Sequence, residues 1–125
     1  QKRNNDYKGE KMSDFSLSVK DDGDVVIIET AGYLNNVGGE KVSEVCYEKM
    51  GGGKKFFLLN LGNSKVVNSI GVSILIEIIE KLQDVDGKLG YCNCAPIVEK
   101  TFKIMGLTKY STVYNTEEEG LAGMA

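Results

Sequence analysis

The residue types that most often carry out catalysis are sparse in this sequence. It contains no histidine, which excludes Ser-His-Asp and Cys-His catalysis, histidine general bases and most zinc sites. Eighteen acidic residues are present, but no pair among them stands out as the two carboxylates of a hydrolase. We therefore expect a protein that is not an enzyme, with no cofactor and no metal site of its own.

Three short motifs suggest a chemical function, but each has a simpler structural explanation. The glycine run at 51–53, which two lysines follow, precedes a strand pattern rather than opening a helix, so it predicts a helix C-cap instead of a phosphate loop. Cys92 and Cys94 lie two apart in a predicted strand and would share a face. Their spacing does not fit a zinc site, and we expect buried, reduced thiols.

The acidic run at 117–119 is the third of these motifs. Thr116 and Glu119 have the spacing of a capping box, which predicts a short final helix whose first turn carries the acids. An acidic recognition patch is the alternative. The odd number of cysteines, with no signal peptide in view, predicts a cytoplasmic protein.

Asn68 and Ser69 stand directly before a strongly apolar helix pattern. Both are good N-cap residues, so capping explains Ser69 as well as function does. A phosphate on Ser69 would add about −1.5 to −2 charge. The helix N-terminus tolerates that charge, whereas a partner docked over it would have to accommodate it. The sequence thus predicts a site for a binding switch.

The helix predicted over 71–82 is more apolar than an ordinary surface helix. At 100° per residue its apolar residues cover an arc of about 200°. Ile74 and Ile78 lie at one border of this arc, and one interpretation is that they are exposed to a partner. The alternative is a helix that neighbouring elements bury deeply.

Periodicity along the chain predicts an α/β domain. Strand patterns alternate with helix patterns, so the connections are crossovers and the central sheet is mixed and mainly parallel, with about five strands and four helices. The first two strands, joined by a turn at 21–23, form an antiparallel pair at the edge. The strands are expected at 15–19, 25–28, 56–61, 89–95 and 110–114, and the helices around 42–50, 71–82 and 96–105 and from 116 onward.

Length and charge limit the remaining classes. The 125 residues suffice for one domain, which we place at 12–125 after a polar leader or extension at 1–11. Fifteen basic and eighteen acidic residues give a net charge of −3, which argues against nucleic acid as a partner. No apolar run is long enough to span a membrane.

A longer pattern resembles a known family. Leu59-Asn60-Leu61 is followed, after six residues, by Asn68-Ser69-Ile70-Gly71. This order and spacing are similar to the central motif of the STAS-domain anti-sigma factor antagonists of bacteria. Further similar pieces are Gly32-Tyr33-Leu34-Asn35, Gly87, Ala95-Pro96-Ile97-Val98, Phe102 and Gly106-Leu107.

The resemblance implies a STAS fold and an antagonist that binds a serine kinase, which is also the anti-sigma factor. Phosphorylation of Ser69 by that kinase switches binding off, a phosphatase restores it, and the kinase supplies ATP and magnesium. The partner-binding residues predicted from the motif and from the apolar arc together are Asn35, Asn68, Ser69, Ile70, Gly71, Ile74 and Ile78. The sequence gives no prediction of oligomeric state.

The sequence departs from the family pattern at three of these positions. Asn35 and Asn68 stand where the family has aspartates, and Ile70 is larger than the usual small residue. The two asparagines favour an alternative function, a phosphorylation-independent STAS interaction module or a small-ligand sensor in a larger signalling complex.

Overall fold

The sheet consists of five strands that pair in chain order. The computed structural model describes residues 15–124. β1 runs antiparallel to β2, and every later pair is parallel, which confirms the predicted mainly parallel sheet. The strands are β1 (Ser16–Asp22), β2 (Val25–Ala31), β3 (Phe56–Asn63), β4 (Lys88–Cys92) and β5 (Thr112–Tyr114).

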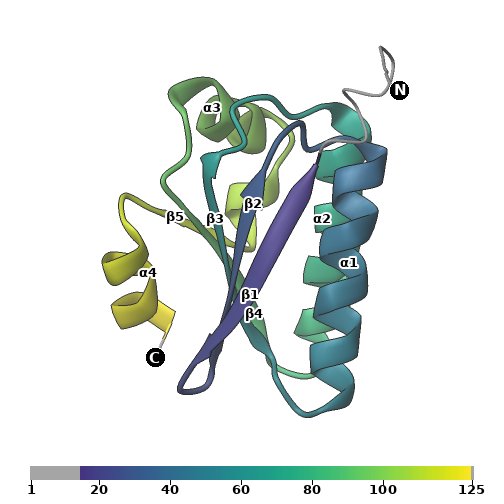
Figure 1. Cartoon of the computed structure of the whole chain (residues 1–125), viewed down its shortest axis with the longest axis vertical. Coiled ribbons are helices and arrows are strands. Elements are labelled where there is room, and N and C mark those ends of the chain that lie inside the picture. The colour runs from purple at the N-terminus through teal and green to yellow at the C-terminus, as the bar shows by residue number, and fades with distance from the viewer. Residues whose placement is uncertain (1–14, 125) are drawn as a thin grey trace, which may run out of the picture.

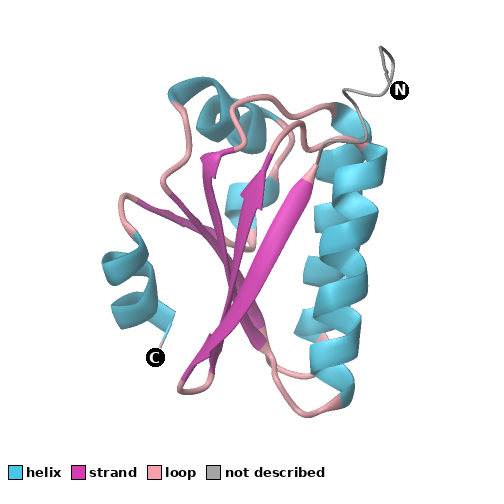
Figure 2. Cartoon of the chain, viewed as in Figure 1, coloured by secondary structure: helices cyan, strands magenta, loops and turns pink. Residues whose placement is uncertain are grey.

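Four α-helices cover the two faces of this sheet (Figure 1, Figure 2). Because the parallel strands follow in chain order and their crossovers share one hand, the three connecting helices lie on the same face. The last helix follows β5 and covers the other face. The helices are α1 (Asn36–Gly51), α2 (Ser69–Gln83), α3 (Pro96–Ile104) and α4 (Glu117–Met124), with a 3-10 turn, η2 (Leu107–Lys109), between α3 and β5.

Two apolar clusters hold the layers together. The larger one lies between the sheet and α1, α2 and α3, and includes Ile28, Leu59 and Leu75. The smaller one lies beneath α4 and includes Ile27 and Leu58. β2 and β3 are therefore buried on both faces, as their continuous apolar runs predict.

The element bounds differ from the predictions where single residues adopt special backbone conformations. The hairpin turn falls at Gly23 and Asp24, where Gly23 has φ +60°, rather than at 21–23. β4 ends at Cys92 because Asn93 has φ +60°. β5 begins at Thr112 rather than at 110, because Tyr110 still closes η2 by donating its N–H to the carbonyl of Leu107.

The break at Asn93 also makes one prediction about the cysteines wrong. Cys92 lies beneath α4, whereas Cys94 packs against the larger cluster, so they do not share a face. Burial raises the pKa of Cys46 and of Cys94 to about 12, and that of Cys92 to about 11. All three are free thiols and stay protonated at neutral pH.

Two of the short motifs take the predicted structural roles. The 51–53 glycines end α1, where the Gly52 N–H donates to the carbonyl of Lys49. The Glu119 N–H donates to Thr116 Oγ1 over 3.1 Å at the start of α4. Glu117 also accepts a hydrogen bond from Asn60 Nδ2 over 3.0 Å, which joins α4 to β3.

Within residues 15–124 no helix has the length and apolar character needed to cross a membrane. The predicted leader at 1–11 lies outside the described residues.

Candidate functional site

Two helix N-termini lie side by side at the C-terminal edge of β2 and β3. Leu34 and Val67 form an isolated parallel bridge beyond the two strands. The Leu34 N–H donates to the carbonyl of Val66 over 2.9 Å, and the Asn68 N–H donates to the carbonyl of Leu34 over 3.2 Å. These bonds join the segment that leads into α1 to the segment that leads into α2.

Each of the two helices begins with an asparagine cap. Asn35 Oδ1 accepts from the Gly38 N–H over 3.1 Å, and Asn68 Oδ1 accepts from the Gly71 N–H over 2.8 Å. Both side chains satisfy a backbone donor that the first helical turn leaves free. Asn68 is therefore the cap of α2, and Ser69 is the first residue inside the helix.

The hydroxyl of Ser69 has no structural task in the described part of the chain. Ser69 is exposed, and among residues 15–124 its Oγ takes part in no hydrogen bond. Its carbonyl accepts from Ser73 Oγ over 2.8 Å. Of the two explanations that the sequence left open for Ser69, capping is thus assigned to its neighbour Asn68.

Two exposed apolar residues lie near Ser69 in the chain, and the two segments that form this edge of the sheet contain no acids. Val66 is 56% exposed and Ile70 is 54% exposed. Neither 32–39 nor 62–76, the two segments that form this edge, contains an aspartate or a glutamate. Ile97, at the start of α3, is also exposed and lines a small cavity of about 160 Å³ with Val66. Sequence reasoning missed Val66 and Ile97 as surface residues because isolated apolar residues in a loop or first turn carry no periodic signal.

Gly71 lets the two helices approach each other. A Cβ at this position would collide with the backbone carbonyl of Leu34, and one at Gly39 would come within 2.9 Å of Ile74 Cδ1. Gly71 itself is buried. Among the predicted partner-binding residues it shapes the site and is not accessible to a partner.

Three other predicted partner-binding residues are buried or half-buried. Ile78 is fully buried and Ile74 is half-buried against α1, so the prediction that both are exposed is wrong. The wide apolar arc of α2 is needed because α1 covers one side of it while the sheet covers another. Asn35 is fully buried, and its Nδ2 has no hydrogen-bond partner among residues 15–124. Of the seven predicted partner-binding residues, only Asn68, Ser69 and Ile70 lie on the surface and are not covered by another helix.

This arrangement, a five-stranded sheet with two capped helix N-termini at one edge, is that of the STAS domain. The sequence model of the STAS domain family matches residues 16–120, and the chain belongs to this family. The chain is 26% identical over 91 residues to BtrV of Bordetella bronchiseptica, which is provisionally named an anti-sigma factor antagonist; the match covers 73% of this chain and 78% of BtrV.

Solved structures with the same fold include proteins named as anti-sigma factor antagonists, a name that TM1081 carries provisionally. The protein TM1081 of Thermotoga maritima has a TM-score of 0.79 at 17% identity, covering 86% of this chain and 93% of that one. The protein from Mycobacterium paratuberculosis has a TM-score of 0.77 at 20% identity, covering 88% and 93%. SpoIIAA of Bacillus in its phosphorylated form has a TM-score of 0.70 at 20% identity, covering 88% and 100%.

Proposed function

We propose that this protein is a cytoplasmic anti-sigma factor antagonist. It binds an anti-sigma factor that is also a serine kinase, and phosphorylation of Ser69 by that kinase weakens the complex. A serine phosphatase restores the binding form. The names of BtrV and of the structural neighbours support the class of function, and the geometry around Ser69 supports the switch.

The free hydroxyl of Ser69 is the observation that carries the proposal. It is exposed at the first position of α2, while Asn68 performs the capping that a serine at this place often performs. A modifying enzyme can therefore take the hydroxyl without removing a hydrogen bond that the helix needs. In the transfer the Oγ–P bond forms, the bond from the γ-phosphorus to its bridging oxygen breaks, ADP leaves and a base of the kinase takes the proton.

A phosphate at Ser69 is compatible with the fold of the free protein. The N-termini of α1 and α2 both present positive dipole ends to this edge, and no acid occurs in the two segments around it. In a complex the same phosphate would replace a neutral hydroxyl beside Val66 and Ile70, which are both more than half exposed. Burying that charge against a partner costs binding free energy unless the partner supplies a cation.

Incubation with the candidate kinase and magnesium ATP, followed by mass spectrometry of the intact chain and its peptides, tests the site. We expect one phosphate on Ser69 in the wild type and none in Ser69→Ala. Ser73→Ala is the matched control, because Ser73 is exposed one turn away, and it should be phosphorylated like the wild type. The double variant Asn36→Ser, Ser69→Ala places a hydroxyl at the first position of α1 and should stay unmodified. Phosphorylation of Ser69→Ala to the wild-type level would exclude the site.

A second candidate function is a STAS interaction module that works without phosphorylation. Asn35 and Asn68 favour it, because neither carries the charge that the resembled family has at these positions. Binding of Ser69→Asp to the kinase separates the two. The switch requires a strong loss of affinity, whereas the module requires affinity close to that of the wild type.

A further inference from the structure

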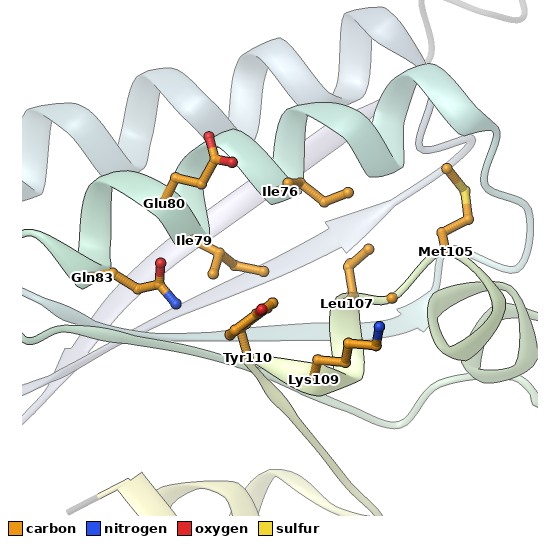
Figure 3. A pocket seen from close by; sticks show the side chains of 9 residues that line it. Ile76, Ile79, Glu80, Gln83, Met105, Leu107, Lys109 and Tyr110 are labelled. Atoms are coloured by element: carbon orange, nitrogen blue, oxygen red, sulfur yellow. The ribbon is translucent and has the colours of Figure 1, made fainter.

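A groove runs between the second half of α2 and the 3-10 turn η2 (Figure 3). Its volume is about 420 Å³, which is in the range of sites that accept a small molecule or a partner's side chain. Ile76 and Ile79 line it from α2, and Leu107 and Tyr110 line it from the other side. Tyr110 is 67% exposed, so an aromatic side chain stands open to solvent at its rim.

The groove lies on the same side of α2 as Ser69. Seven residues separate Ser69 from Ile76, which at 100° each brings Ile76 to within about 20° of Ser69 around the helix. The rise of 1.5 Å per residue places it about 10 Å further along the axis. Ser73 lies between them on this side and is exposed. A protein that docks over Ser69 and follows α2 would therefore reach the groove.

Two charges of opposite sign stand on opposite sides of the groove. Glu80 extends from α2 and Lys109 from η2 (Figure 3). Both are exposed, and neither forms an ion pair with another residue of 15–124. An apolar slot between an unpaired carboxylate and an unpaired ammonium group fits a surface of the inverse pattern.

We propose that this groove anchors the kinase partner, an inference that rests on the proposed function of Ser69. The occupant is one apolar side chain of the kinase, with an acidic residue facing Lys109 and a basic residue facing Glu80. Continuity along α2 and the charge pattern favour a protein surface over a free small molecule. The groove supplies affinity that does not depend on the phosphorylation state, while Ser69 supplies the switch. Buried apolar anchors of this kind carry much of the energy of protein interfaces.

Binding measurements with the purified kinase that modifies Ser69 test the anchor. Tyr110→Glu should weaken binding about tenfold or more, because it replaces an aromatic side chain that the docked partner would cover with a charge that the complex would have to desolvate. Lys109→Glu should weaken it about threefold by reversing one charge at the rim. Tyr47→Glu is the control, since Tyr47 is exposed on α1 away from the groove, and should leave binding unchanged. Circular dichroism verifies that each variant is folded, and Lys109→Glu decides the matter should Tyr110→Glu fail to fold.

The outcomes separate the anchor from the switch. Loss of binding in Ser69→Asp, with Tyr110→Glu and Lys109→Glu both like the wild type, would overturn the anchor and keep the proposed function. Wild-type binding by Ser69→Asp, with loss in Tyr110→Glu, would keep the groove as the docking site and overturn the switch. If size-exclusion chromatography shows a wild-type dimer that Tyr110→Glu dissociates, a second copy occupies the groove and the anchor is overturned. A wild-type chain that binds no serine kinase overturns both.

Discussion

Helix α1 and helix α2 both begin with an asparagine cap that a glycine follows three residues later. In α1 the pair is Asn35 and Gly38, and in α2 it is Asn68 and Gly71, with cap distances of 3.1 and 2.8 Å. Asn35 is completely buried, however, whereas Asn68 is partly exposed. One local motif thus serves two purposes, because the tertiary surroundings decide which cap is enclosed and which is open to a partner.

The comparison assigns different roles to the two N-termini. The N-terminus of α1 supports that of α2, since Leu34 and Asn35 lie against α2 and the Asn68 N–H donates to the carbonyl of Leu34. The N-terminus of α2 is the presented one, with a free hydroxyl at Ser69 and an exposed apolar neighbour at Ile70. A substitution in the support, or at Gly71 where α2 contacts the support, should therefore change folding stability first. A substitution of an exposed side chain such as Ser69 should change binding first.

Gly71→Ala should have the largest effect on stability. The added methyl group would collide with the backbone carbonyl of Leu34, which cannot move aside as a flexible side chain can. We expect a loss of about 3 kcal/mol in the free energy of unfolding, measured by urea titration. Gly51→Ala is the control, because nothing lies within 4 Å of its added Cβ. A loss no larger than that of Gly51→Ala would show that the two helices are not held in contact at Gly71.

Removing the two caps should rank next, with the enclosed cap the more costly. Asn68→Ala should lower the free energy of unfolding by about 1 kcal/mol, the usual cost of a lost N-cap. Asn35→Ala should lower it by about 2 kcal/mol, because a cavity in a fully buried site adds to the lost cap. The same urea titrations measure both. Equal losses would contradict the distinction between a supporting and a presented N-terminus.

The sequence predicts much of this arrangement and leaves part of it open. Periodic and continuous apolar patterns locate β2, β3 and α2, and the STAS-like motif locates Ser69. Which side of α2 is covered depends on where α1 packs, and the glycines at 38 and 39 that let α1 begin at Asn36 resemble a loop in sequence. The exposure expected for Ile74 and Ile78 was wrong for this reason. Periodicity gives the width of an apolar arc but not the number of neighbours that share it.

The groove beside η2 illustrates the same limit. Its two walls come from residues 76–83 and 105–110, which the sequence assigns to separate elements. The 3-10 turn that places Tyr110 at the rim has no periodic signal, and Tyr110, which directly follows the turn, was predicted to begin the fifth strand. Features that form only where two elements meet are visible in the packing and not in either segment alone.

Ser69→Ala should have the smallest effect on stability, and this makes it the sharpest comparison between the two residues at the start of α2. The Ser69 hydroxyl makes no hydrogen bond within residues 15–124, while the adjacent Asn68 makes the cap. We expect the free energy of unfolding of Ser69→Ala to stay within about 0.5 kcal/mol of the wild type, as for a surface substitution that removes no contact. Urea titration beside Asn68→Ala measures the difference between them. A loss in Ser69→Ala equal to that in Asn68→Ala would mean that the Ser69 hydroxyl stabilises the helix. Phosphorylation of Ser69 by a kinase would then weaken the fold.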